Sequence, residues 1–371
     1  MKIWLNGKYG NAKMFNNFYK DKRIVITGHT GFKGAWLSIW LHHLGSHVVG
    51  YALEPPTKPS LFEACKLEDK ITSITGNVRN YRLLRDVLEK YKPEIVFHMA
   101  AQSLVRNSYR EPLETYKTNV MGTVNMLEAC RHTSSVRVVV NITSDKCYEN
   151  KEWEWGYSEN DPMGGYDPYS SSKGCAELIT NAYIKSYFNP DTFKKHGKSL
   201  ASARAGNVIG GGDWAEERLI PDCIKALIEN IPVVIRYPDA VRPWQHVLEP
   251  LYGYLLLAQN LYQDGSAFIG GWNFGPYDED ARPVRWIVEK MTKMWGNNAS
   301  WVIDKSNHPY ESHFLKLDCS KAKTKLGWHP EWDLNSALER TIEWYKTYLI
   351  NKDMFNFSIN QIEAYERCIK T

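Results

Sequence analysis

Residues 23–34, Arg-Ile-Val-Ile-Thr-Gly-His-Thr-Gly-Phe-Lys-Gly, join a short apolar run to a glycine-rich turn. The run at 23–27 predicts a buried parallel strand, and residues 32–44 carry apolar side chains at helical spacing. A G-x-x-G-x-x-G turn between a strand and a helix lets backbone N–H groups approach a diphosphate, so this stretch predicts a dinucleotide-binding loop. The candidate contacts in the turn are Gly28, His29, Thr30, Gly31, Phe32 and Gly34.

The alternation of strand and helix continues to about residue 205. The runs that resemble strands and helices lie at 46–51, 81–91, 94–99, 112–131, 137–142, 167–187 and 199–204. Repeated units of this kind predict an α/β fold built on a Rossmann-type, doubly wound parallel sheet. Beyond it, glycines and prolines separate shorter elements, which predicts a smaller C-terminal α/β substrate-binding domain.

The length of 371 residues exceeds that of one typical domain. We therefore expect an N-terminal extension at 1–22, a dinucleotide-binding domain at 23–205 and a mainly substrate-binding region at 206–371. Within the last region, a segment at about 245–275 is expected to return to the large domain.

Composition excludes several classes of protein. The net charge is only +4 and the basic residues are scattered, so no nucleic-acid partner is expected. The apolar runs are too short for a membrane span. The seven cysteines are odd in number and never form C-x-x-C, which argues against disulfides and structural zinc and favours a cytoplasmic location. His42, His43 and His47 lack the glutamate of a zinc motif, so no metal is expected.

Tyr169 and Lys173 form a Y-x-x-x-K pair in a predicted helix. The spacing of four puts both side chains on one face, where the ammonium favours the phenolate and lets the tyrosine remove a hydroxyl proton. Taken alone, such a pair is more often an exposed surface pair. Ser144, Asp145 and Lys146 follow the strand at 137–142, at the sheet edge where open α/β sheets place their chemistry. We expect the Ser144 hydroxyl to complete a Ser-Tyr-Lys set.

The order of these motifs resembles the short-chain dehydrogenase/reductase family. His98-Met99-Ala100-Ala101-Gln102 and Asn77-Val78 stand where that family carries its cofactor motifs. The resemblance implies NAD as cofactor. The cofactor contacts that it adds to the glycine turn are Asn77, Val78, Ala100, Ala101, Gln102, Tyr169 and Lys173. The second strand lacks the acidic residue that usually contacts the ribose, and no arginine there offers a site for a 2′-phosphate, so we expect NAD rather than NADP. The missing acid, and His29, which crowds the loop, predict a loosely held cofactor.

Within this family, the pair Asp145-Lys146 resembles the nucleotide-sugar 4,6-dehydratases, in particular those that act on CDP-glucose, and the likeness covers residues 23–332. It implies oxidation at C4, loss of water across C5 and C6, and return of hydride to C6, which regenerates NAD. The product would be CDP-4-dehydro-6-deoxy-D-glucose, used in deoxysugar synthesis of the O-antigen type. We assign Asp145 as the acid and Lys146 as the base; an electrostatic role for Lys146 stays open.

The same resemblance implies further features. The candidate substrate contacts are Ser103, Asn207, Arg218, Arg242, His246 and His308. The helices at 112–131 and 167–187 are expected to pair into a homodimer interface. The alternatives are a dehydratase for another nucleotide sugar, a nucleotide-sugar 4-epimerase, or a non-catalytic dinucleotide sensor. Such sensors generally lose the tyrosine or the lysine, and here both are present.

Overall fold

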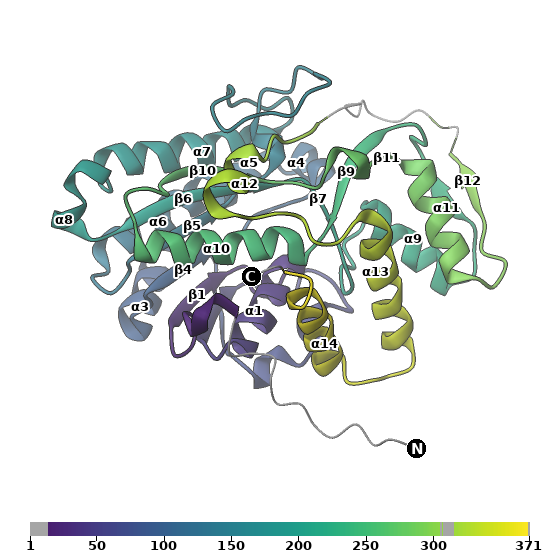
Figure 1. The fold of residues 1–371 in the computed structure, drawn as a ribbon, viewed down its shortest axis with the longest axis horizontal. Helices are drawn as coiled ribbons and strands as arrows, with labels where there is room; N and C mark the ends of the chain where they lie inside the picture. Colours follow the sequence, from purple (N-terminus) through teal and green to yellow (C-terminus); the bar gives the residue numbers. More distant parts are fainter. Residues whose placement is uncertain (1–13, 305, 307–314, 370–371) are drawn as a thin grey trace.

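The computed structural model describes residues 14–304, 306 and 315–369. Its centre is a seven-stranded parallel sheet (Figure 1). In spatial order the strands are β10 (Gly270–Phe274), β6 (Ser199–Ala205), β5 (Val138–Ile142), β4 (Ile95–His98), β1 (Arg23–Thr27), β2 (His47–Ala52) and β3 (Thr72–Thr75). The strand order reverses between β1 and β4, and this arrangement confirms the predicted Rossmann-type doubly wound sheet.

Helices cover both faces of the sheet. On one face α3 (Tyr81–Tyr91), α6 (Gly122–His132) and α7 (Pro168–Ser186) pack against strand residues such as Val25 and Val96. On the other face α1 (Phe32–His43) and α10 (Leu248–Gln263) pack against residues such as Ile24 and Phe97. Alternate residues of each strand thus enter opposite layers, as the period of two requires.

The expected long helix at 112–131 is divided into three parts. It comprises α5 (Pro112–Tyr116), a π-helical turn (Lys117–Met121) and α6. The extra residue of a π-turn shifts the helix register, and here it brings Asn119 into the core, where its amide donates to Ser172 Oγ at 2.9 Å. The predicted helix at 167–187 is observed as α7, capped by Asp167.

The smaller part of the chain holds two short sheets and several helices. One sheet has the order β11 (Ala281–Pro283), β9 (Val241–His246), β7 (Asn207–Ile209), and the other pairs β12 (Trp301–Ile303) with β8 (Val233–Ile235). The helices of this part are α9 (Leu219–Ile228), α11 (Val284–Trp295), α12 (Ser320–Leu326) and α13 (Leu334–Leu349). The remaining short helices are α2 (Leu61–Ala64), α4 (Val105–Arg110) and α8 (Phe193–His196).

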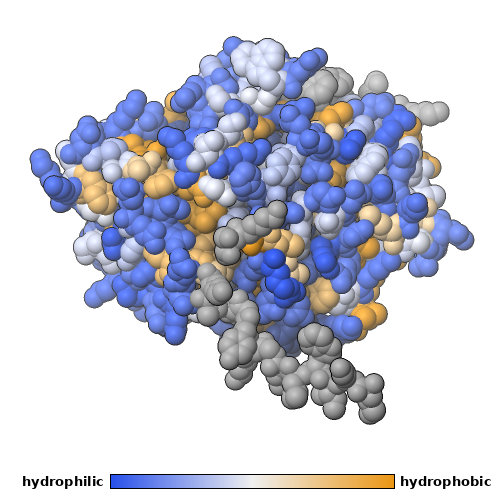
Figure 2. Space-filling model, in the orientation of Figure 1, coloured by the Kyte–Doolittle hydropathy of each residue, from blue (hydrophilic) through white to orange (hydrophobic). Residues whose placement is uncertain are grey.

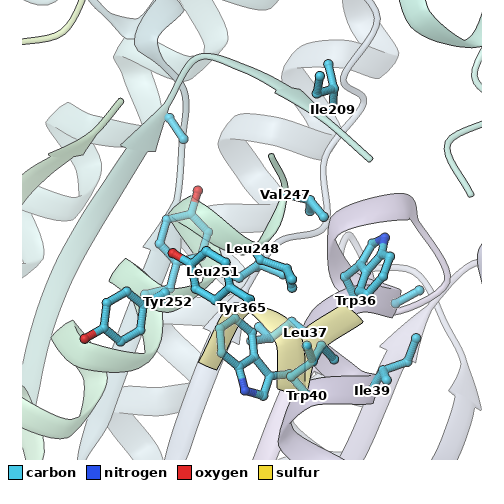
Figure 3. Close-up of a cluster of buried hydrophobic side chains, with 14 of the residues drawn as sticks. Trp36, Leu37, Ile39, Trp40, Ile209, Val247, Leu248, Leu251, Tyr252 and Tyr365 are labelled. Carbon is cyan, nitrogen blue, oxygen red and sulfur yellow. The ribbon is translucent and has the colours of Figure 1, made fainter. Parts of the chain in front are cut away.

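The last helix, α14 (Met354–Glu366), returns to the large sheet. Figure 3 shows Tyr365 beside Trp40 of α1 and close to Tyr252 of α10. The Trp40 indole donates to Glu366 Oε1 at 2.8 Å, and the rings of Trp40 and Tyr365 meet edge to face. The end of the chain is therefore part of the core around α1 and α10.

The N-terminal extension is also attached where the structure describes it. Tyr19 is 1 % exposed, and its hydroxyl donates to the Leu255 carbonyl of α10. Over the described residues, no helix is both long enough and apolar enough to cross a bilayer. The face drawn in Figure 2 is mainly hydrophilic, with hydrophobic residues in small patches.

Candidate active site

The glycine turn forms a close cradle at the start of α1. Gly28 has a φ of +77°, and a Cβ there would lie 2.8 Å from the Ala100 nitrogen. A Cβ on Gly34 would lie 2.1 Å from the Gly28 carbonyl oxygen. Gly31 precedes α1 and offers no side-chain cap, so the first N–H groups of the helix remain available to an anion. The cradle therefore fits a diphosphate, and Ala100 of the predicted motif lies against it.

His29 points away from the cradle and into the sheet. Its Nε2 lies 2.7 Å from Ser73 Oγ, and a Cβ on Gly50 would overlap the imidazole ring. Burial lowers the His29 pKa to about 4, so the ring is neutral at pH 7. His29 thus fills the space between the loop and strands β2 and β3.

The other predicted cofactor residues divide into two groups. Ala101 and Phe32 are half-buried beside the loop, while Thr30 is buried and donates to the Leu53 carbonyl at 2.9 Å. Asn77 and Gln102 instead have local partners for their side chains. Asn77 Oδ1 accepts from the Arg79 backbone at 2.9 Å.

The Gln102 side chain hydrogen-bonds its own loop and helix α5. It accepts from the Leu104 backbone at 2.6 Å and donates to Thr115 Oγ1 at 3.0 Å. Val78 is 4 % exposed and lies in the core against Gly122. The Gln102 side chain is therefore occupied by partners within the protein, and that of Val78 is buried in the core.

The catalytic candidates converge at the carboxyl end of β5. Ser144 Oγ donates to Asp145 Oδ1 at 2.8 Å and accepts from the Lys146 backbone at 3.2 Å. The Ser144 side chain also lies close enough to the Tyr169 phenol to lower its pKa. Lys173 Nζ lies 6.0 Å from the centre of the Tyr169 ring and donates to the Ile142 carbonyl at 3.3 Å. The structure thus brings the predicted serine, tyrosine and lysine into one cluster.

Burial shifts the pKa values in this cluster. It raises the pKa of Tyr169 to about 12, an effect that the neighbouring Ser144 side chain opposes. It lowers the pKa of Lys173 to about 8. Burial also raises the pKa of Asp145, against the opposing charges of Lys146 and Lys33. A carboxyl with a raised pKa suits a general acid, and a lysine of lowered pKa beside a phenol suits proton transfer near neutral pH.

Gly206 provides the space for the Asp145 carboxyl. A Cβ at residue 206 would lie 2.8 Å from Asp145 Oδ2. Gly206 also lines a pocket with residues of the smaller part of the chain, and the other lining residues are Pro243, Gly275, Pro276, Tyr277, Asp278, Ala281, Lys316 and Leu317. The pocket therefore adjoins the carboxyl group, while Lys146 is half-buried on the same turn.

Two predicted substrate residues meet beside this cluster. Arg218 donates to Ser103 Oγ at 2.9 Å and to Asp213 Oδ2 at 3.0 Å. Its charge acts on both Tyr169 and Lys33, so it lies close to the catalytic groups. Ser103 and Arg218 come from opposite parts of the chain, and their contact bridges the large sheet and α9.

Two further predicted substrate residues adjoin the lining of the pocket, since Asn207 follows Gly206 and Arg242 precedes Pro243. Asn207 begins β7, and Arg242 lies on β9, where its guanidinium donates to the Val241 carbonyl at 3.0 Å. Both are partly exposed. His308 lies outside the described residues.

His246 does not reach the substrate side, contrary to the prediction. It is 0 % exposed and packs between Trp36 and Trp332. Burial lowers its pKa to about 3, and its Nδ1 accepts from the Leu248 backbone at 3.3 Å. The apolar surroundings of the R-P-W-Q-H segment place this ring in the core.

Two residues near the catalytic candidates, Lys33 and Tyr254, were not predicted from the sequence. Lys33 lies in the glycine loop, and its side chain approaches Lys173, Arg218 and Asp145 closely enough for their charges to shift its pKa, which burial lowers to about 8. Tyr254 of α10 lies under the Lys33 ammonium. A lysine inside a glycine motif was the available signal for Lys33, whereas nothing in the apolar helix 248–263 indicated Tyr254.

In the described part of the chain, no three histidine, cysteine, aspartate or glutamate side chains gather in a way that could hold a metal ion.

Comparison with known proteins identifies the class. The family model described as GDP-mannose 4,6 dehydratase matches residues 25–341, and the chain belongs to this family. Among its relatives is the CDP-glucose 4,6-dehydratase of Salmonella typhimurium, 57% identical over 349 residues, which are 94% of this chain and 97% of that protein. The resemblance seen in the motifs is thereby confirmed.

Solved structures agree on the fold. The UDP-glucose 4-epimerase of Thermotoga maritima has a TM-score of 0.76 at 22% identity and covers 88% of this chain and 99% of its own. The dTDP-glucose 4,6-dehydratase of Bacillus anthracis, in complex with NAD, has a TM-score of 0.72 at 21% identity, over 88% of this chain and 97% of its own.

Proposed function

We propose that the chain is an NAD-dependent CDP-glucose 4,6-dehydratase, which converts CDP-D-glucose into CDP-4-dehydro-6-deoxy-D-glucose. The observation that carries the proposal is the buried cluster of Ser144, Asp145, Tyr169 and Lys173 beside Lys146. An epimerase needs the serine, tyrosine and lysine alone, whereas a dehydratase also needs an acid and a base. The 57% identity to the Salmonella enzyme supports CDP-glucose as the substrate.

The residues of the glycine loop fit a dinucleotide cofactor. Gly28, Gly31 and Gly34 would hold its diphosphate at the start of α1, and a side chain at Gly28 or Gly34 would collide with backbone. The backbone around Ala100 and Ala101 would flank it. NAD, when bound, supplies the acceptor of the C4 hydride and later its donor.

Tyr169 acts first in the proposed reaction. Its phenolate would remove the proton of the C4 hydroxyl, while the Ser144 hydroxyl orients that oxygen. Burial raises the pKa of Tyr169 and so disfavours the phenolate that this step requires. The Lys173 ammonium would offset this effect by stabilising the phenolate. The C4 carbonyl that results makes the C5 proton acidic.

Asp145 and Lys146 act in the elimination of water. The raised pKa of Asp145 keeps a proton available for the leaving C6 hydroxyl. Lys146 would remove the C5 proton or stabilise the enolate that forms. Both residues lie on one three-residue turn, so they can act on adjacent carbons of one sugar.

The nucleotide part is expected to contact Ser103, Asn207, Arg218 and Arg242. Guanidinium groups bind phosphate oxygens through two parallel hydrogen bonds, which suits Arg218 and Arg242 to the diphosphate of the substrate.

The homodimer is also a proposal. Apolar side chains stand exposed on α4, α5, the π-turn and α7, namely Tyr109, Leu113, Tyr116, Met121 and Leu178. A self-complementary pairing of these helices would bury them. Replacing Leu113 and Leu178 by Glu should give a monomer in light scattering, whereas an unchanged mass would rule out this interface. We further propose a cytoplasmic location, consistent with seven free cysteine thiols.

The substrate is tested by incubating the protein with NAD and CDP-, dTDP-, GDP- or UDP-glucose. We expect a 4-keto product from CDP-glucose alone. A product from another nucleotide sugar would reassign the specificity, and C4 inversion without loss of water would make the protein an epimerase. Bound nucleotide without any reaction would favour the dinucleotide sensor.

A further inference from the structure

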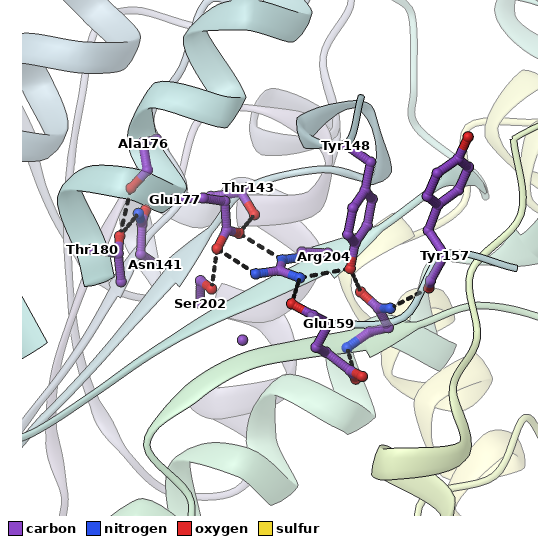
Figure 4. A network of polar contacts seen from close by, with 12 residues as sticks. Asn141, Thr143, Tyr148, Tyr157, Glu159, Ala176, Glu177, Thr180, Ser202 and Arg204 are labelled. Carbon is purple, nitrogen blue, oxygen red and sulfur yellow. Dashed lines mark hydrogen bonds and ion pairs between the residues drawn. The ribbon is translucent and has the colours of Figure 1, made fainter. Parts of the chain in front are cut away.

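A buried ion pair contacts the residues on either side of the segment 144–147, which we call the catalytic turn. Arg204 of β6 and Glu177 of α7 are 4 % and 5 % exposed. The guanidinium donates to both carboxylate oxygens, from Nε at 2.9 Å and from the terminal nitrogen Nη2 at 2.7 Å (Figure 4). Removing two charges from water costs about as much free energy as their attraction returns, so such a pair is poor evidence of added stability. Its other contacts therefore indicate what it does.

These contacts hold both ends of the catalytic turn. Glu177 accepts a short hydrogen bond from the Thr143 hydroxyl, immediately before Ser144. Arg204 donates to the Tyr148 hydroxyl at 2.6 Å, immediately after Cys147. The segment 144–147, which carries the serine, the acid and the base, is thus fixed at each end by one partner of the same pair.

The pair also reaches the tyrosine–lysine helix. Glu177 follows Lys173 by four residues on α7, and its negative charge favours the protonated lysine. Tyr169 and Lys173 themselves lie on a helix of 19 residues with its own cap at Asp167. The three-residue turn of Asp145 and Lys146 has far less internal support, so it depends more on the contacts at its ends.

Beyond Tyr148 the network continues to the pocket wall. The Tyr148 hydroxyl donates to Asn273 Oδ1 at 2.8 Å, and the Asn273 amide donates to the Asp318 carbonyl at 3.1 Å. Asp318 follows Lys316 and Leu317, which line the pocket beside Gly206. One chain of hydrogen bonds therefore links Tyr148, which follows the turn of the acid and base, to Asp318, which follows two residues that line the pocket.

We propose that Arg204 and Glu177 are positioning residues for the elimination of water, which act by holding the turn of Asp145 and Lys146 in register with Tyr169. The proposal rests on the proposed function, because it assigns the elimination step to that turn. Loss of the Arg204–Tyr148 link should release one end of the turn and misplace the acid and base, while the helix-borne Tyr169 and Lys173 keep their place.

The test uses Tyr148→Phe, which removes one hydroxyl, and Arg204→Lys, which keeps the charge but not the paired hydrogen bonds. In single turnover of CDP-glucose we expect C4 oxidation near the wild-type rate and elimination about 10- to 100-fold slower. Reduced nicotinamide, followed by its absorbance, should accumulate. A merely structural role would slow both steps alike.

Glu249→Gln is the matched control. Glu249 is equally buried and accepts from the Tyr365 hydroxyl at 2.7 Å and the Trp332 backbone at 2.8 Å, away from the catalytic turn. This variant should keep the wild-type ratio of the two rates. Equal slowing of oxidation and elimination in Tyr148→Phe, or a wild-type ratio in both Tyr148→Phe and Arg204→Lys, would overturn the proposal.

Hydrogen exchange gives a readout that needs no substrate. Backbone amides of 143–148 should exchange faster in Arg204→Lys than in the wild type. In Glu249→Gln their exchange rates should equal those of the wild type. If the wild-type protein formed no 4-keto sugar from any nucleotide sugar, the proposed function would fail. In that case unchanged exchange at 143–148 would still refute the positioning role, and faster exchange confined to this segment would support it.

Discussion

Lys33 Nζ lies 5.9 Å from the centre of the Tyr254 ring, and the Tyr254 hydroxyl is buried with no hydrogen-bond partner among the described residues. Both side chains face the catalytic cluster, since the pKa of Lys33 and that of Tyr254 each respond to Asp145. The glycine loop therefore places the Lys33 ammonium group close to the catalytic cluster, near the Tyr254 ring and other cationic side chains.

Replacing Lys33 by Met should stabilise the folded protein near neutral pH. Burial lowers the Lys33 pKa to about 8, below its value near 10.5 in the unfolded chain. Between these two pH values the unfolded state binds more protons, so the free energy of unfolding rises with pH. Lys33 is partly exposed, which reduces the cost of its charge. We therefore expect Lys33→Met to raise the free energy of unfolding by about 1–3 kcal/mol at pH 7 and to make that free energy depend less on pH. Denaturant unfolding at pH 7 and pH 9.5 measures both effects.

The exposed Lys352→Met serves as the control for Lys33→Met and should change neither quantity. A loss of stability in Lys33→Met at pH 7, with an unchanged pH slope, would contradict the buried-charge argument.

Replacing Tyr169 by Phe should slow turnover by about 10²- to 10⁴-fold, the usual contribution of a proton-transfer group. The ring remains, so NAD binding, followed by fluorescence quenching, should stay within about threefold of the wild type. For the wild type, kcat/KM should fall as the pH rises above about 8, because Lys173 then loses the charge that stabilises the phenolate. An undiminished turnover in Tyr169→Phe would remove it from the mechanism.

Replacing Lys146 by Met should leave NAD binding and C4 oxidation intact but block loss of water. The base would be absent, so the C5 proton should no longer exchange with deuterated solvent, which NMR of the sugar detects. Exchange that persists at the wild-type rate would show that Lys146 is not the base. Exchange that is slowed but still measurable would instead support its electrostatic role, in which the ammonium stabilises the enolate.

Replacing His246 by Phe should make the protein more resistant to acid. His246 has a pKa of about 3 in the folded state and about 6.5 when unfolded, so stability is lost as the pH falls from 6.5 toward 3. Removing this histidine should recover roughly 2 kcal/mol at pH 4.5, measured by denaturant unfolding. The KM for CDP-glucose should not change, since the ring lies in the core. A large rise in KM would restore the substrate role that the sequence suggested.

The motifs predicted the large sheet well because their periodicity is strong. Strand β1 was predicted to the residue, and β5, β6 and α7 were predicted within one residue at each end. Strand β3, with the sequence Thr-Ser-Ile-Thr, was missed because three of its four side chains are exposed at the sheet edge. Strand β10 was missed because it begins with Gly270 and Gly271, which are uncommon in strands. The lack of a side chain at Gly271 leaves room for the Arg204 guanidinium.

The site was predictable only where residue type alone fixes the chemistry. Ser144, Asp145, Tyr169 and Lys173 come together as their spacing suggested. Asn77 and Gln102 are ordinary polar side chains that local turns occupy, and sequence gives no sign of that competition. The Glu177–Arg204 pair joins residues 27 apart across α7 and β6, and such a long-range contact has no local signal.

The anchoring of α14 on α1 determines how the smaller part of the chain can move. That part leaves the large sheet after β6, the chain returns to the sheet for α10 and β10, and α14 contacts α1 through Glu366 and Tyr365, so the smaller part is attached at several points. A lobe joined by a single connection can rotate widely, whereas a lobe attached at several points is limited to small shear or hinge movements. We therefore expect substrate entry to depend on the short segments that line the pocket, and cutting the chain before Met354 to remove one of these attachments and expose Trp40.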